Sequence, residues 1–415
     1  MMRSTILAAT LLAATAMATA AKADPDNFTE VQRGRYLATA GDCMGCHIGP
    51  DGKSLAGGNL LETPFGKISV PNITPDNETG IGHWSAQDFY EAMHEGKRPG
   101  GTHLYPAFPY TAFTKMPRAD TDAIYAYLRA QEGVTNRVDR DTLPFPFNIR
   151  LLMAGWNWLN FTPGAFRPDP QKSAAYNRGA YLVEGPAHCG LCHTPRNFMG
   201  GDKDGEHLQG GALQGWFAPS ITANKRLGIG AWSEAEIVDY LRSGHTERGA
   251  ASGPMGEVVA YSTSRMTGED LRAIATYLRE RGAAGAAAPQ PVAAGDARMQ
   301  AGAAIYEDSC AACHTRDGSG VAGMFPRLAD NQLVQQPDPA GILHVVLQGS
   351  QSVPTPQAVT APAMPSLRWR LTDQQVADVA TFIRNSWGNA AAAVTTDQVK
   401  AMREATAGIA MPQRH

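Results

Sequence analysis

The sequence predicts an all-α protein of three tandem helical units joined by long loops. A Cys-x-x-Cys-His box occurs three times, as CMGCH from residue 43, CGLCH from residue 189 and CAACH from residue 310. Each box follows a short helix-like segment that contains a glycine, and each unit closes with an amphipathic helix. The 415 residues suffice for two or three domains. The 43 glycines and 28 prolines favour turn-rich loops between short helices.

The N-terminal segment 1–23 is predicted to be a secretory signal peptide. Arg3 supplies a small positive region, an apolar run from Ile6 to Met17 follows, and AKA at 21–23 is an A-x-A cleavage site. A transmembrane anchor is the alternative, but the run is short and rich in Ala and Thr. Cleavage leaves a formal net charge of −5, which argues against nucleic acid or anionic lipid as a direct partner. We expect a periplasmic protein whose membrane association is only peripheral or through a partner.

The repeat defines the expected domain boundaries. VPNITPDNETGIGHWS from residue 70 matches APSITANKRLGIGAWS from residue 218 at a constant offset of 148, and FPRLADNQ from residue 325 holds the same place in the third copy. The expected order is a first unit at 28–135, an apolar connection at 136–171, a second unit at 172–283, a linker at 284–295, a third unit at 296–390 and a polar tail at 391–415. The connection is too apolar for a free linker, so we expect it to pack between the first two units or to face a partner.

Opening and closing helices are expected in every unit. The opening segments are marked by Gly34, Gly179 and Gly302. The closing helices are predicted at 120–130, 268–280 and 372–385, where apolar residues recur at i, i+3 and i+4. We interpret these apolar stripes as core that packs against the opening helices.

The CxxCH boxes indicate covalent haem. A CxxC pair alone also serves as a redox dithiol or as half of a zinc site, but a following histidine is the attachment signal of c-type haem. Two thiols on one turn add to the two vinyl groups of a porphyrin, and the next imidazole then reaches the iron. No cysteine remains for a disulfide framework, although the chain is expected to be exported. We therefore expect three covalent haem c groups, attached through Cys43, Cys46, Cys189, Cys192, Cys310 and Cys313.

The same boxes supply the expected proximal iron ligands, which are His47, His193 and His314. Pro71, Pro219 and Pro326 hold equivalent places downstream, and their carbonyls are expected to accept the imidazole N–H. Methionine as sixth ligand closes the iron site and raises its reduction potential. Met255, in SGPMGEVV, and Met364, in APAMPSLRW, lie in the expected loops of the second and third units.

The first unit departs from this pattern. Phe108 aligns with Met364 and cannot ligate iron. Met116 is nearby, but it aligns with Met266 and Leu371, a hydrophobic position just before the closing helix, which favours a core role. The candidates for the sixth position of the first haem are His103, Met116 or an open site.

These motifs, together with HLYPAFPY and LQGGALQGWFAPSIT, resemble the tri-haem cytochrome c subunit of bacterial periplasmic and membrane-associated dehydrogenases over residues 28–390. That family serves alcohol, gluconate, sorbitol, fructose and aldehyde dehydrogenases. The resemblance implies class I cytochrome c-like domains and a catalytic partner that carries flavin, pyrroloquinoline quinone or molybdopterin. It also implies electron delivery to ubiquinone or a terminal oxidase. Family members often carry methionine at the position of Phe108, and some carry a membrane-binding C-terminal segment that is less polar than this tail.

The sequence therefore favours an electron-transfer subunit without catalytic residues of its own. No Gly-rich nucleotide fingerprint follows a strand, and no cysteines remain for an iron–sulfur cluster. The haems would carry the chemistry, while the protein sets their spacing and potential. The alternatives are a stand-alone soluble multihaem shuttle and a haem peroxidase that acts at an open first haem.

Overall fold

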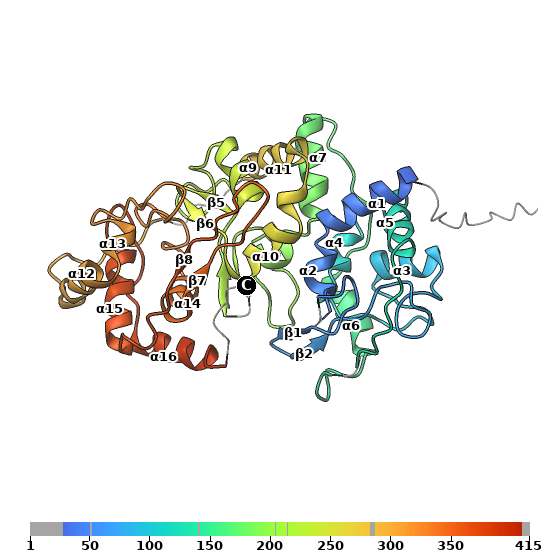
Figure 1. Cartoon of the computed structure of the whole chain (residues 1–415), viewed down its shortest axis with the longest axis horizontal. Helices are drawn as coiled ribbons and strands as arrows, with labels where there is room; N and C mark the ends of the chain where they lie inside the picture. Colours follow the sequence, from blue (N-terminus) through green and yellow to red (C-terminus); the bar gives the residue numbers. More distant parts are fainter. Residues whose placement is uncertain are drawn as a thin grey trace, which may run out of the picture.

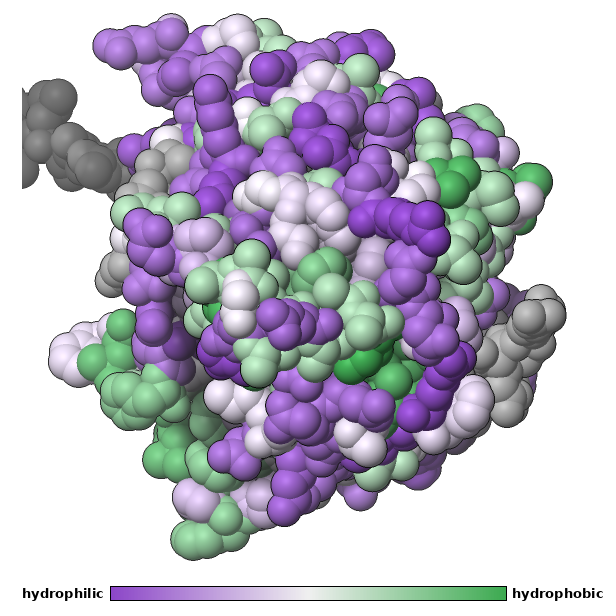
Figure 2. Space-filling view, turned by 90° about the vertical axis from the view of Figure 1, so that its left-hand side faces the viewer, coloured by the Kyte–Doolittle hydropathy of each residue, from purple (hydrophilic) through white to green (hydrophobic). Residues whose placement is uncertain are grey.

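The computed structural model describes residues 28–49, 52–139, 142–203, 205–213, 215–282 and 287–408. The predicted signal peptide, residues 284–286 of the linker and residues 409–415 of the tail lie outside these ranges. The described chain is mostly helical and elongated, with the first unit at one end and the third at the other (Figure 1). The third-unit end mixes hydrophilic surface with small hydrophobic groups (Figure 2). No described helix has the length and apolar character needed to span a membrane.

One helix crossing occurs in all three units, between an opening and a closing helix (Figure 1). The pairs are α1 (Phe28–Ala40) with α5 (Arg118–Arg129), α7 (Ala174–Glu184) with α11 (Gly268–Glu280), and α12 (Ala297–Ser309) with α15 (Asp373–Arg384). The predicted closing helices are therefore present. The bounds of α11 agree with the prediction, and those of α5 and α15 differ from it by one or two residues.

The glycines of the opening helices lie where the two helices touch. A Cβ atom added to Gly34 would stand 1.8 Å from the carbonyl oxygen of Ala123. The same construction gives 1.9 Å from Gly179 to the Ala273 oxygen. In the third unit it gives 2.3 Å from Gly302 to the oxygen of Asp378. Only a residue without a side chain permits backbones to approach so closely, which explains why each opening segment contains glycine.

Shorter helices lie between each crossing pair. The CxxCH boxes form α2 (Cys43–His47), α8 (Gly190–His193) and α13 (Ala311–His314). A middle helix follows in each unit: α3 (Ala86–Glu95), α9 (Glu234–Ser243) and α14 (Ala340–Gln348). The first two units add α4 (Tyr110–Phe113), α10 (Gly253–Tyr261) and the 3₁₀ turn η1 (Thr263–Arg265). Capping boxes at Ser85–Asp88 and Ser233–Glu236 begin α3 and α9, so the repeated sequence has repeated local structure.

Among the described residues, four small antiparallel sheets of two strands each depart from the predicted all-α fold. They are β1 (Leu60–Thr63) with β2 (Gly66–Ser69), β3 (Gly211–Leu213) with β4 (Trp216–Ala218), β5 (His245–Thr246) with β6 (Gly249–Ala250), and β7 (Ser350–Gln351) with β8 (Ala363–Met364). Strands of two to four residues are too short for an alternating pattern to be recognised. The first two hairpins end just before Pro71 and Pro219 and bring these prolines back toward the CxxCH boxes.

Within the part of the chain that the structure describes, the buried residues form two main clusters. One is shared by the first two units and includes Leu37, Met116, Ile124, Leu182 and Ile274. The other belongs to the third unit and includes Tyr306, Leu343, Val376, Val379 and Ile383. The apolar stripes of the closing helices therefore contribute to the core, as predicted, and the first two units are packed together more intimately than the repeat alone implies.

The apolar connection 136–171 contains α6 (Leu152–Asn160), whose two sides differ. Trp156 is buried, and its Nε1 donates to the carbonyl oxygen of Met199 at 2.9 Å. The hydroxyl of Tyr110 donates to Asn157 Oδ1 at 2.6 Å. This side therefore packs between the first and second units. The other side is exposed, with Trp158 84% accessible.

The polar tail contains a further helix, α16 (Thr396–Ala405), which packs against α14 and α15. Val394, Val399 and Met402 join the core of the third unit. The third unit thus extends beyond the expected boundary at residue 390, because these apolar side chains pack against α14 and α15.

Candidate haem sites

The three box histidines make the same contact. Each Nδ1 atom donates a hydrogen bond to a proline carbonyl oxygen. The pairs are His47 with Pro71 at 2.7 Å, His193 with Pro219 at 2.7 Å and His314 with Pro326 at 3.0 Å. A proton on Nδ1 leaves the lone pair on Nε2, which is the tautomer that a metal ligand requires. The predicted proline partners are therefore in place in all three units.

The surrounding protein keeps these imidazoles neutral. Burial lowers the pKa of His47 to about 4 and also lowers the pKa of His193 and of His314. A neutral imidazole is the form that coordinates iron. The donor set of two thiols and one oriented, neutral imidazole fits a c-type haem at each box.

The box cysteines do not resemble a redox dithiol. None of the six forms a disulfide in the described structure, and they lie on or beside α2, α8 and α13. Burial raises the pKa of Cys43 and of Cys189 to about 12. Thiolate redox chemistry needs a lowered thiol pKa, so this environment opposes it.

The two expected distal methionines lie in different local structures. Met255 is in the first turn of α10, after Pro254, and is partly buried. Met364 is in β8, where it pairs with Ser350 of β7, and it also packs partly buried against the third-unit core. Both have a thioether held on ordered backbone.

Met116 has the core position that its alignment predicted. Its side chain is 0% exposed, and its carbonyl oxygen accepts a hydrogen bond from His94 Nε2 at 2.6 Å. The aligned residues Met266 and Leu371 are also buried just before their closing helices. Met116 thus packs like its counterparts in the other two units.

Phe108 and His103 have different surroundings. The Phe108 ring stands edge-on to Phe113, with 5.5 Å between the ring centroids. His103 pairs through its backbone with Lys97, and its Nδ1 is buried without a hydrogen-bond partner among the described residues. A buried imidazole nitrogen without a partner is costly unless something else binds it.

The first two boxes face each other, an arrangement that was not predicted from the sequence. His188 Nε2 donates to the carbonyl oxygen of Gly41 at 3.2 Å. Burial, together with the nearby Glu257 carboxylate, raises the pKa of Asp42 to about 7. Asp42 and His188 each precede the first cysteine of a box, and both have positive φ, at 49° and 37°. Asp42 and His188 occupy the same position in the repeat, and this match was the one sequence feature that could have pointed to the contact between the two boxes.

A reciprocal polar network joins the same two units and was also missed. Asp120 of α5 accepts hydrogen bonds from Arg33 of its own unit and from Tyr181 of the second unit. Asp270 of α11 accepts from Arg178 of its own unit at 2.8 Å and from Tyr36 of the first unit at 2.6 Å. Each aspartate therefore binds one arginine locally and one tyrosine across the interface. The matching segments RGRYL and RGAYL place an arginine and a tyrosine at the same positions in both units, and this match could have pointed to the network.

Comparison with known proteins shows the family to which this chain belongs. The family profile described as "Cytochrome c" matches residues 31–132 and 299–387. The gluconate 2-dehydrogenase cytochrome c subunit of Pantoea cypripedii is 41% identical over 409 residues, which is 93% of this chain and 92% of that protein. The chain belongs to the family of cytochrome c subunits of bacterial dehydrogenases. Membership implies covalently bound haem c in this cytochrome c subunit.

Two further relatives match this chain over most of its length. The cytochrome c subunit of the quinone-type alcohol dehydrogenase from Gluconacetobacter polyoxogenes is 39% identical over 435 residues, which covers 98% of this chain and 91% of that protein. One subunit of the nicotinate dehydrogenase from Pseudomonas putida is 44% identical over 366 residues. That match covers 86% of this cytochrome c subunit but 30% of the relative's length.

Proposed function

We propose that this cytochrome c subunit binds three haem c groups and passes electrons from a partner dehydrogenase to ubiquinone or a terminal oxidase. The carrying observation is that one site occurs three times. Each copy has two thiols on or beside a short helix and a neutral histidine oriented by a proline carbonyl, in a unit with a glycine-mediated helix crossing. The proposed domains are class I cytochrome c units at 28–135, 172–283 and 296–390, the last extended by α16.

The proposal gives each site residue a role. The six box cysteines form the thioethers, and His47, His193 and His314 are the proximal ligands. Met255 and Met364 are the distal ligands of the second and third units. When bound, the haem iron alternates between the ferric and ferrous states and so carries one electron at a time. The proline carbonyls hold each imidazole in one tautomer and one orientation.

The partner is proposed to be a flavin-, pyrroloquinoline quinone- or molybdenum-dependent dehydrogenase that oxidises alcohol or aldehyde groups. Support comes from the exposed side of the 136–171 connection, where several large apolar side chains face outward. Their accessibilities include 79% for Phe145, 77% for Leu151 and 84% for Trp158. Exposed apolar groups gathered in one segment mark an interaction surface. Export by the segment 1–23 would place the assembly in the periplasm.

The test is made on the mature protein purified alone. Its intact mass should exceed the polypeptide mass by three haem groups, with the chain beginning after Ala23. Mixed with alcohols, sugar acids or aldehydes, the oxidised protein should stay oxidised until a partner dehydrogenase is added. A gain of two haems or fewer contradicts the stoichiometry. Haem reduction by these substrates without a partner contradicts the role of an electron-transfer subunit, and rapid turnover of hydrogen peroxide would favour a peroxidase.

The first haem is expected to have the lowest reduction potential of the three. Phe108 cannot supply a thioether, Met116 is packed in the core, and His103 offers nitrogen. Methionine sulfur favours ferrous iron, so a haem with nitrogen or no sixth ligand has a lower potential. In a redox titration, Phe108→Met should raise the lowest potential toward the other two.

Met116→Leu is the matched control, because leucine keeps the volume of a buried side chain and occupies the aligned position 371. It should leave the three potentials and the methionine-to-iron charge-transfer absorption unchanged. If instead Met116→Leu removes one third of that absorption, Met116 is the sixth ligand of the first haem.

A further inference from the structure

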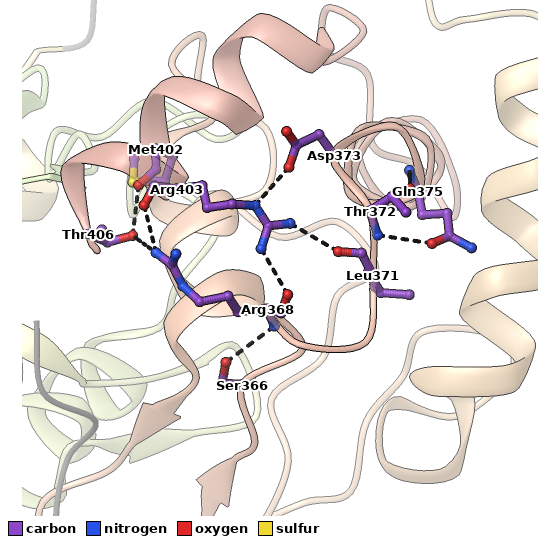
Figure 3. A network of polar contacts seen from close by, with 9 residues as sticks. All are labelled: Ser366, Arg368, Leu371, Thr372, Asp373, Gln375, Met402, Arg403 and Thr406. Carbon is purple, nitrogen blue, oxygen red and sulfur yellow. Dashed lines mark hydrogen bonds and ion pairs between the residues drawn. The ribbon is translucent and has the colours of Figure 1, made fainter. Parts of the chain in front are cut away.

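Helix α16 lies across the end of α14 and the start of α15 and is tied to the loop between Met364 and Leu371 (Figure 3). Its apolar side is buried in the third-unit core, with Val399 0% exposed. In the first two units the chain instead continues from α5 toward α6 and from α11 into the linker. We call the loop from Met364 to Leu371, beside α16, the distal loop of the third unit.

Arg403 is the centre of the contact between α16 and this loop (Figure 3). Its Nη1 donates to the carbonyl oxygen of Arg368 at 2.8 Å, and its Nη2 donates to that of Leu371 at 2.9 Å. Its Nε donates to Asp373 Oδ1, in the first turn of α15, at 2.7 Å. The planar fork of a guanidinium is suited to holding several acceptors at fixed angles. One side chain thus fixes both the loop and the helix that follows it.

Side chains of the loop and of α14 also donate hydrogen bonds to the end of α16. Arg368 Nη2 donates to the carbonyl oxygen of Arg403 at 2.8 Å and to Thr406 Oγ1 at 2.6 Å (Figure 3). Gln348, at the end of α14, donates through Nε2 to the Thr406 carbonyl oxygen at 2.9 Å. The end of α16 is therefore bound to both segments that flank β7 and β8.

Met364 lies at the start of this clamped loop. Its backbone pairs with Ser350, two residues after Gln348. Just beyond it, Ser366 Oγ donates to the Leu347 carbonyl oxygen at 2.6 Å, and the Leu367 N–H donates to that of Val346 at 3.0 Å. The backbone at Met364 is therefore paired with β7, the residues just after it are bound to α14, and the loop beyond them is bound to α16.

From these contacts we propose that α16 is a latch for the distal loop of the third haem, with Arg403 as the positioning residue that keeps Met364 in ligating position. The proposal rests on the proposed function, in which Met364 is the sixth ligand. Ordering a flexible loop costs conformational entropy. Because α16 already orders the loop, forming the bond between the Met364 sulfur and the iron does not require this loss of entropy. Imidazole therefore displaces the methionine less readily.

The test compares Arg403→Ala and Met364→Leu in the full, haem-loaded protein. The probes are the methionine-to-iron charge-transfer absorption and its displacement by added imidazole. Met364→Leu should remove one haem's share of the absorption. In Arg403→Ala, imidazole should displace the methionine of the third haem at a concentration about tenfold lower than in the wild type. The reduction potential of that haem should also fall. Arg403→Lys, which keeps fewer donors, should fall between Arg403→Ala and the wild type.

Arg370→Ala is the matched control on the same loop. The Arg370 side chain pairs with the exposed Asp308 of α12 and not with α16 in the described structure, so imidazole displacement should be unchanged. If Met364→Leu leaves the absorption intact, the proposed ligand is wrong and the latch falls with it. If Met364→Leu removes one haem's absorption but Arg403→Ala is displaced by imidazole at the wild-type concentration, Met364 is the ligand and the proposed role of α16 is wrong. Should Arg403→Ala not fold, Thr406→Val replaces it, and unchanged displacement in that variant also overturns the latch.

Discussion

Gly34→Ala is expected to destabilise the protein by about 3 kcal/mol or more. The new Cβ would lie 1.8 Å from the carbonyl oxygen of Ala123 and 2.9 Å from the Cβ of Tyr127. Neither atom is the flexible end of a side chain, so α1 and α5 must separate. Because the core of the first unit is continuous with that of the second, this separation opens both. Helix propensity alone predicts the opposite sign, since alanine is favoured over glycine in a helix by about 1 kcal/mol.

Gly155→Ala is the matched control, because it makes the same substitution inside α6, where the new Cβ meets nothing within 4 Å. It should leave the melting temperature unchanged or raise it slightly. The measurement is thermal unfolding of the haem-loaded protein, followed by circular dichroism. A Gly34→Ala protein that melts with the wild type would show that the helix crossing does not require glycine.

Asp120→Ala is expected to destabilise the junction between the first two units by about 2–3 kcal/mol. Asp120 is buried and accepts hydrogen bonds from Arg33 and from Tyr181. Arg33 is more than half exposed, so its guanidinium returns to water at little cost. The hydroxyl of Tyr181 is enclosed, and without Asp120 it is left unsatisfied. Most of the loss therefore comes from the bond between units.

A double-mutant cycle with Tyr181→Phe separates this effect from general damage. Removing the hydroxyl should relieve much of the penalty of Asp120→Ala, so the double variant should be more stable than the sum of the single changes predicts. Asp122→Ala, in the same helix, breaks only the partly exposed pair with Arg118 and should cost about 0.3–0.5 kcal/mol. Additive losses in the cycle would mean that Asp120 and Tyr181 do not act together.

The features that could be predicted from the amino-acid sequence are local ones. The spacing of each CxxCH box places two thiols and an imidazole on one turn wherever the box occurs. The 3.6-residue period of the apolar positions located α5, α11 and α15 to within two residues. The prolines whose carbonyl oxygens accept hydrogen bonds from His47, His193 and His314 were predicted from their equivalent places in the repeat. Each of these features depends on chain spacing within a single unit.

The tertiary structure decided how the units meet. Tyr36 reaches Asp270, 234 residues away, and no periodicity within a unit encodes such a pairing. The third unit has Ala304 at the position of Tyr36 and Tyr181, and Gln375 at that of the aspartates, but the difference acquires meaning only once the interface is seen. The tail from residue 391 was expected to be polar because Val399 and Met402 stand among Thr, Gln, Ala and charged residues. They become a buried face only because α14 and α15 already form a surface for them to cover, and burial of this kind is a property of the assembled chain.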